Sequence, residues 1–490
     1  MKQPDGCFIC IEKHALSFAA KGGEMVSYQK RWLCFVLVPA LMLSAAGMAA
    51  ARGLYDKPPE LERLIGELIE NNEELQSLAE ERDALAAEIS VAGALDDPRL
   101  GIGVANLPTD TFSFSQEPMT QKTLFIAQKF PWFGKLDLRT QRAVVAVERQ
   151  KAVIDARRLD LVKALTTTYY DLGFVAESLR VNAELFQMVQ QMLQVAEASY
   201  ASGQGLQQDV FQAQVELGKL IDERIELEKR QYTLVARINE LLNRPAYGKV
   251  QGPGEPTLPE LVLDPEAVQR WTLDHNPMLR VRQADIDRAL INIDLARKNY
   301  YPDMDFNVAY GQRDEDRTGR DLPDFVSASV VVNLPLWQGQ KQDKQLLAEE
   351  NRHKAATKAY ESLQLALPHQ VDAVLNEIDA IQENMRLFGG GLLEQTANWS
   401  QSALSAYEVG KVDFDTMIKA HMRALQFQLQ AQRYRFQYTT KLTELETLAG
   451  IVLKDIARPE ASAPGASGPA ASGHAMPARP TPPHHLAEVN

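Results

Sequence analysis

The sequence predicts a mainly helical protein with a small β part, built from a duplicated unit of long helical hairpins and strand pairs. Apolar side chains recur between residues 161 and 200 in alternating steps of four and three, which is the spacing of a coiled-coil seam. Segments of the first half also return in the second: Asn72-Glu-Glu-Leu75 as Asn276-Pro-Met-Leu279, and Tyr200-Ala-Ser-Gly203 as Tyr407-Glu-Val-Gly410. A long repeat at a nearly constant offset indicates a duplicated structural unit.

The first segment, residues 1–51, is expected to be a signal peptide. A basic stretch at residues 28–31 precedes the apolar run Trp32–Leu43, and Ala49-Ala-Ala51 is an A-x-A-like cleavage site. Met25 lies at a more usual distance from the apolar run than Met1, so we take Met25 as an alternative start. The competing interpretation is an uncleaved membrane anchor, because Trp32–Ala51 is just long enough to span a bilayer.

The two ends of the chain carry little chemistry. All three cysteines (Cys7, Cys10 and Cys34) precede the predicted cleavage site, so the mature chain is expected to form no disulfide. Residues 458–490 are rich in Pro, Ala and Ser and are predicted to be a disordered tail that contains His474, His484 and His485. The net charge of -13 argues against a nucleic-acid partner.

The first repeat is predicted over residues 60–245. It opens with a helix from Glu60 to Val91, continues with a strand pair at residues 98–131 and ends with a helical hairpin at residues 135–242. The long helix of this hairpin, Lys135–Ala198, would measure roughly 95 Å. Residues 246–264 then form a linker.

The second repeat is predicted over residues 265–452, with a helix, a strand pair at residues 302–335 and a helical hairpin at residues 341–449. Pro368 and the glycines at positions 389–391 are expected to interrupt the long helix of this hairpin. Three consecutive glycines lower helix propensity by roughly 3 kcal/mol, so a kink is expected there.

The strand pairs alternate in polarity. Met304, Phe306, Val308 and Tyr310 point to one side of their strand, and Asp305, Asn307, Ala309 and Gly311 to the other. Such alternation is typical of transmembrane barrel strands, although a half-buried soluble sheet would show it too. Four strands cannot close a barrel, so a membrane location would require several chains, and three chains would supply about twelve strands.

These residues together resemble the TolC-like outer-membrane factors, which are the exit ducts of tripartite efflux and type I secretion systems. The resemblance covers residues 60–452 and rests on the duplication, the Asn-(Pro)-x-Leu helices, the Tyr-x-x-Gly turns and the Pro-x-x-Gly exits from the second strands. It implies a homotrimer in the outer membrane of a Gram-negative-type bacterium, with a 12-stranded β-barrel in contact with lipid and an α-helical periplasmic tunnel. The partners it implies are a periplasmic adaptor and an inner-membrane pump.

The sequence of residues 128–135, Gln-Lys-Phe-Pro-Trp-Phe-Gly-Lys, is similar to that of the heavy-metal cation (CusC- and CzcC-like) subgroup. The resemblance also implies that the adaptor docks beside the hairpin tips, at Tyr200, Gly203, Tyr407 and Gly410. It places a gate there as well, with Asp209 and Tyr407 as a hydrogen-bonded latch. Thr416 and Lys419 stand where an acidic ring would be expected, so Asp413 and Asp415 become its substitutes, although both residues also suit helix N-capping.

Other classes of function remain open at this level. One alternative within the family is a type I secretion duct, and one outside it is a secreted periplasmic coiled-coil scaffold. An enzyme is not indicated, because the sequence has no nucleophile triad, zinc-protease motif or P-loop. His275, His353, His369 and His421 lack ligand spacing, so no cofactor or metal is expected. The sequence does not identify the cargo, because a duct discriminates mainly through the pump that feeds it.

Overall fold

The computed structural model describes residues 57–256, 258 and 263–450. The predicted signal peptide with its cysteines and the predicted tail at 458–490 lie outside the described residues, as does part of the linker. Among the described residues, no helix combines the length and the apolar character needed to cross a membrane.

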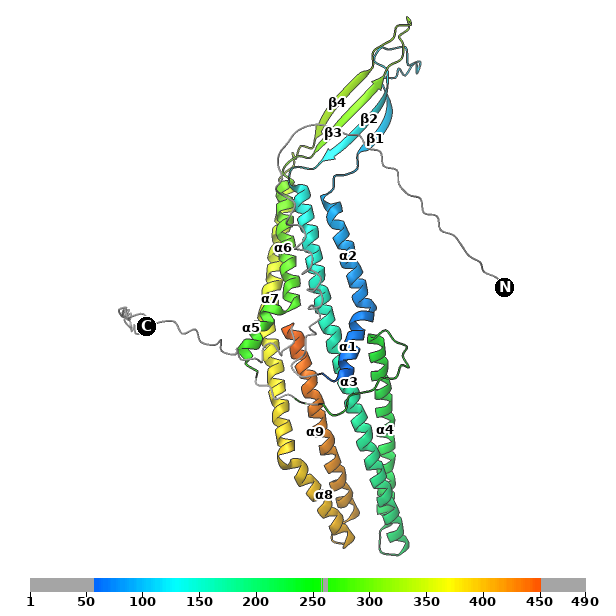
Figure 1. Cartoon of the computed structure of the whole chain (residues 1–490), viewed down its shortest axis with the longest axis vertical. Coiled ribbons are helices and arrows are strands. Elements are labelled where there is room, and N and C mark those ends of the chain that lie inside the picture. Colours follow the sequence, from blue (N-terminus) through cyan, green and yellow to red (C-terminus); the bar gives the residue numbers. More distant parts are fainter. Residues whose placement is uncertain (1–56, 257, 259–262, 451–490) are drawn as a thin grey trace, which may run out of the picture. The chain divides into compact units, whose positions relative to one another are not determined.

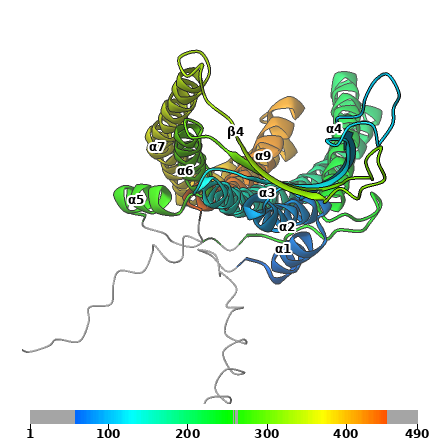
Figure 2. The ribbon, with the colours of Figure 1, turned by 90° about the horizontal axis from the view of Figure 1, so that it is seen from above.

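The order of elements in the first half of the chain returns in the second half (Figure 1). The first half contains α1 (Pro59–Asn71), α2 (Glu73–Gly93), β1 (Arg99–Ala105), β2 (Gln121–Phe130), α3 (Lys135–Ala201) and α4 (Gln207–Leu241). The second contains α5 (Pro265–His275), α6 (Pro277–Lys298), β3 (Met304–Gln312), β4 (Phe325–Val332), α7 (Gln342–Leu387), the π-helical turn η1 (Phe388–Leu392), α8 (Leu393–Glu408) and α9 (Phe414–Ala449). Seen from above, α2 packs on α3, and α6 on α7 (Figure 2).

The single opening helix predicted from Glu60 to Val91 is wrong, because the chain breaks it at Asn72. Asn72 leaves the helical region (φ -74°, ψ 114°), and its side chain accepts from the Leu75 N–H to cap α2. Its amide also donates to the Leu241 carbonyl at 3.0 Å. Asn276 repeats both bonds, capping α6 and donating to the Leu448 carbonyl at 2.9 Å. The repeated asparagine therefore joins two short helices and ties their junction to the end of the returning helix.

The interruption expected at Pro368 is also wrong, because α7 continues through it. The neighbouring Leu367 and Val371 are buried, and packing of α7 on α5, α6 and α9 offsets the hydrogen bond that proline removes. The glycine run does distort the helix, as η1 contains Gly390 and Gly391 outside helical geometry. Gly391 has φ +127°, a backbone conformation that residues other than glycine rarely adopt.

The four strands form one antiparallel sheet in the order β1-β2-β3-β4. The register places Leu100, Ile126, Val308 and Ala328 in one row, and Ile102, Leu124, Tyr310 and Val326 in the next. Directly paired residues share a face of the sheet. One face is therefore continuously apolar across all four strands, and its large side chains are exposed in the single chain.

An ion pair joins the two repeats where the strands meet the helices. Lys135, the first residue of α3, donates to Asp303 at 2.8 Å, and Asp303 also accepts from the Trp132 N–H at 2.9 Å. Burial alone would raise the pKa of Asp303, but these hydrogen bonds and the lysine charge lower it below its usual range. The Trp132 ring stacks on Tyr301 with centroids 5.0 Å apart.

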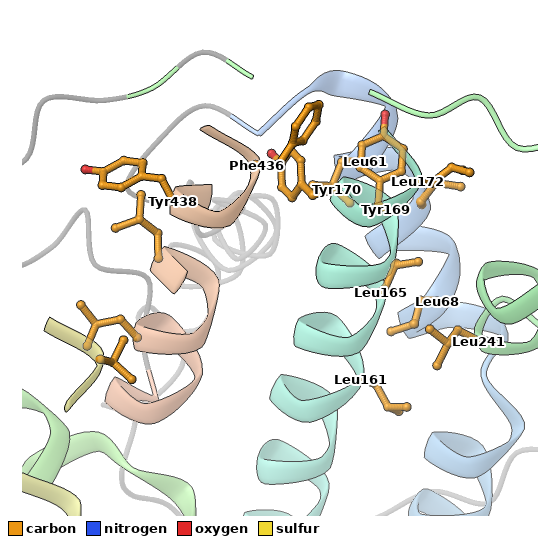
Figure 3. Close-up of a cluster of buried hydrophobic side chains, with 14 of the residues drawn as sticks. Leu61, Leu68, Leu161, Leu165, Tyr169, Tyr170, Leu172, Leu241, Phe436 and Tyr438 are labelled. Atoms are coloured by element: carbon orange, nitrogen blue, oxygen red, sulfur yellow. The ribbon is translucent and has the colours of Figure 1, made fainter. Parts of the chain in front are cut away.

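The main core lies where α1, α3, α4, α7 and α9 approach one another. Leu61, Leu68, Leu165 and Leu241 pack there with Tyr169, Tyr170 and Phe436 (Figure 3). Burying a leucine stabilises a fold by about 1.5–3 kcal/mol. This core connects the two hairpins of the chain, and a second cluster of buried side chains connects them again near their turns.

Candidate functional site at the hairpin tips

Both hairpin turns share one backbone motif at the Tyr-x-x-Gly sequence. Gly203 and Gly410 adopt left-handed geometry, with φ +77° and φ +70°. The Gly203 N–H donates to the Tyr200 carbonyl and the Gly410 N–H to the Tyr407 carbonyl, while the next residue in each turn donates one position further back. This is the Schellman helix ending, which strongly favours glycine at the left-handed position. The glycines thus have a structural reason, and the turn leaves both tyrosine side chains available for other contacts.

The two tips enclose a cleft of about 790 Å³, here called the tip cleft. Side chains from α3, α8, α9 and the start of α4 line it, together with residues of the two turns. Among them are Met188, Met192, Asp209, Tyr407, Asp413, Phe414, Met417 and His421. The cleft lies between the first hairpin (α3 and α4) and the second (α8 and α9). A change in its width therefore changes the distance between the two tips.

The tip cleft brings Asp209 and Tyr407 together. Burial raises the pKa of Asp209, and the charge of Asp413 raises it further, although a backbone hydrogen bond at Leu206 opposes this. The pKa of Tyr407 is raised by burial and then by the charge of Asp209. No hydrogen bond joins their side chains within the described residues, and the Tyr407 ring packs against Phe414 with centroids 5.9 Å apart.

Asp413 and Asp415 have different partners. Asp413 is the N-cap of α9 and accepts from the Thr416 N–H at 2.9 Å. Hydrogen bonding by the Thr416 side chain, and then by this N–H, lowers the pKa of Asp413. Asp415 accepts from Lys419 of its own helix and from Gln212 of α4, and these bonds lower its pKa. The Gln212 Nε2 to Asp415 Oδ1 distance is 2.5 Å, and this bond directly links the two hairpins.

The structure divides the residues singled out in the sequence into two groups. Asp209, Tyr407, Gly410 and Asp413 line the tip cleft. Tyr200, which is 49% exposed, Gly203 and Asp415 are not among its lining residues. Sequence reasoning missed Gln212, because no local pattern shows which residue of the other hairpin a glutamine meets. Among the described residues, no group of three or more His, Cys, Asp and Glu side chains is arranged to hold a metal ion.

A duplicated set of hairpins with one shared four-stranded sheet is the architecture of TolC-like channels. Residues 64–244 and 270–451 match the family of outer membrane efflux proteins, which is most of the described chain. The chain belongs to the outer membrane efflux protein family.

Nodulation protein T and two solved channels are similar to this chain at low sequence identity. A 196-residue segment is 24% identical to Nodulation protein T of Rhizobium leguminosarum bv. viciae and covers 38% of this chain and 40% of that relative, so less than half of its length is matched. The Campylobacter jejuni CmeC outer membrane channel superposes with a TM-score of 0.69 at 12% identity, over 80% of this chain and 86% of that one. CusC superposes with a TM-score of 0.66 at 15% identity, over 81% and 95%. At these identities the structural likeness establishes the fold.

Proposed function

We propose that the protein is a passive, gated exit duct of the outer membrane, assembled as a homotrimer. The observation that carries the proposal is the sheet, which has one continuous apolar face and two unpaired edges, β1 and β4. Unpaired backbone groups are too costly in lipid, so the edges must find partners. Three copies joined edge to edge give a barrel of about twelve strands, within the range of known barrels.

The helices then form the periplasmic part of the duct. Lys135 begins α3 directly after β2, so each hairpin leads away from the sheet and ends at its tip. Three chains would combine their hairpins into an α-helical tunnel whose mouth lies at the tips. We infer that a periplasmic adaptor and an inner-membrane pump dock at this mouth, beside Tyr200–Gly203 and Tyr407–Gly410. Asp209, Tyr407, Asp413 and Asp415 form or support its gate.

Heavy-metal cations are the cargo that we propose. The sequence of residues 128–135 supports this, because it resembles the heavy-metal cation subgroup. A type I secretion duct has the same architecture and would differ in its pump and adaptor. A secreted periplasmic scaffold is the second candidate, and the exposed apolar face of the sheet argues against it, because such a face would promote aggregation in water.

Assembly and extraction test the proposal together. The mature protein should require detergent for extraction, migrate as a trimer and conduct ions in planar bilayers. A monodisperse monomer that is released without detergent would contradict the duct and support the scaffold. Sequencing the N-terminus of the same material tests the signal peptide, because a product that retains Trp32 would exclude cleavage near Ala51.

A further inference from the structure

A further cavity lies where the strands meet the helices. It measures about 700 Å³ and is here called the sheet-base groove. Apart from Asp137, the side chains that line it are apolar or aromatic, and they include Leu95, Phe130, Trp132, Phe133, Leu136 and Phe306. Its volume lies within the range of roughly 300–1,000 Å³ that is usual for small-molecule sites. The groove is therefore large enough for an apolar ligand.

The groove continues the apolar face of the sheet. The register pairs Phe130 with Met304, and Ile126 with Val308. Alternate residues of a strand share a face, so Phe130, Met304 and Phe306 lie on the same face as Ile126 and Val308. The hydrocarbon that would cover this face in the proposed duct therefore reaches the groove without a polar barrier.

The position of the groove along the strands selects one leaflet of the membrane. It lies at the end of β2 where α3 begins, opposite the connection 106–120 between β1 and β2. In the proposed duct the helices extend into the periplasm, so this end of the sheet meets the periplasmic leaflet. Trp132 lines the groove and stacks on Tyr301, and these are the residue types that gather at membrane–water interfaces.

Two opposite charges stand at the edge of the groove. Lys298 is the last residue of α6, and a Cβ added at Gly134 in the groove wall would lie 3.5 Å from its ammonium nitrogen. Asp137, in the first turn of α3, is exposed and lines the groove. Neither side chain has an ion-pair partner among the described residues. A phosphodiester complements the lysine, and an ammonium group complements the aspartate.

We propose that the sheet-base groove binds one phospholipid of the periplasmic leaflet per chain, with a zwitterionic ethanolamine headgroup. The inference rests on the proposed outer-membrane duct and names a lipid partner of its sheet. An acyl chain lies along Phe130 and Phe306, the phosphate contacts Lys298 and the ethanolamine ammonium contacts Asp137. A bound lipid would contact both the sheet and the first turn of α3.

The test is native mass spectrometry of the full-length mature protein in detergent, titrated with phosphatidylethanolamine or with phosphatidylglycerol that has the same acyl chains. Lys298→Gln removes the contact with the phosphate, and Leu95→Trp fills the groove. The matched controls are Lys249→Gln, at an exposed lysine, and Val91→Trp, at an exposed valine that does not line the groove. Asp137→Asn tests the headgroup separately.

The expected result is one phosphatidylethanolamine per chain, bound more tightly than phosphatidylglycerol. Lys298→Gln should weaken binding by at least about fivefold, the effect of one partly exposed charge-assisted contact, and Leu95→Trp should weaken it as well. Both controls should bind like wild type. Asp137→Asn should lose the preference for phosphatidylethanolamine over phosphatidylglycerol.

Equal binding of the two lipids by the wild type, or wild-type binding in Lys298→Gln and Leu95→Trp, would overturn the proposal. Trimer formation and conductance are measured on the same samples. A conducting trimer that retains no phospholipid would overturn the lipid site and leave the duct intact, whereas a protein that neither trimerises nor conducts would remove both.

Discussion

Removing the bond between the tips should open the duct. Gln212 donates to Asp415 across the two hairpins, so Gln212→Ala removes a contact that exists only while α4 and α9 lie together. The same carboxylate keeps its bond to Lys419 of its own helix, so the variant leaves Asp415 paired. The change is therefore specific to the connection between the hairpins.

The size of the effect follows from the kind of bond. A hydrogen bond to a charged group stabilises by about 1.5–3 kcal/mol, and the partial exposure of the Asp415 side chain (36%) reduces this to about 1 kcal/mol. One such bond changes the ratio of open to closed tips about fivefold. In a trimer whose three tips open together, the loss is about 3 kcal/mol and the ratio changes about a hundredfold.

Open probability in planar bilayers measures this ratio directly. The matched control is Gln208→Ala, which removes the same side chain one turn earlier on α4, where it lines the tip cleft without a hydrogen bond among the described residues. We expect Gln212→Ala to open far more often than wild type and Gln208→Ala to behave like wild type. Equal open probabilities in all three proteins, or equal increases in both variants, would refute the role of the cross-tip bond.

Three further predictions concern the gate, the repeat and the junction with the sheet. Tyr407→Phe combined with Asp209→Ala should raise bilayer conductance if these residues form the latch, and unchanged conductance would remove it. Asn276→Ala loses a helix cap and the hydrogen bond to the Leu448 carbonyl, so thermal unfolding in detergent should show a loss of about 2–4 kcal/mol, absent in the exposed control Gln283→Ala. Because the pKa of Asp303 is lowered in the folded state, its ion pair stabilises the fold above the usual aspartate pKa, and this stabilisation is lost as the pH falls through the lowered pKa. Asp303→Asn should therefore show a smaller drop in melting temperature between pH 6 and pH 3 than the wild type. An identical drop in both proteins would contradict this.

The features that could be predicted from the sequence are those with a strong local period. The alternation of Met304, Phe306, Val308 and Tyr310 fixes which face of β3 is apolar, because a slip of one residue would reverse every side chain. The four-three spacing along α3 likewise identifies a long packed helix. Both patterns result from contacts that repeat along an element, so each residue adds evidence for the same conclusion.

The features that could not be predicted depend on single residues and distant partners. Asn72 has ordinary helix propensity, and only its bond to the Leu241 carbonyl shows why the helix ends there. Pro368 fails as a helix breaker because buried neighbours hold α7 on both sides. Gln212 and Asp415 are 203 residues apart in sequence, and they meet only because the two hairpins pack side by side at their tips. No window of the sequence contains that information.

The Tyr-x-x-Gly turns show how one motif can serve two purposes. At both tips the glycine adopts the left-handed conformation that ends the helix. Recurrence of the motif therefore reflects backbone geometry and does not by itself identify a docking site. The tyrosines differ: Tyr200 is half-exposed at its turn, whereas Tyr407 packs on Phe414 near the charge of Asp209. A partner protein can reach the first without disturbing the tip cleft, but cannot displace the second without separating packed rings. We therefore propose that the adaptor docks mainly at the first tip and that gating depends mainly on the second, because the two turns share one backbone motif and differ in their surroundings.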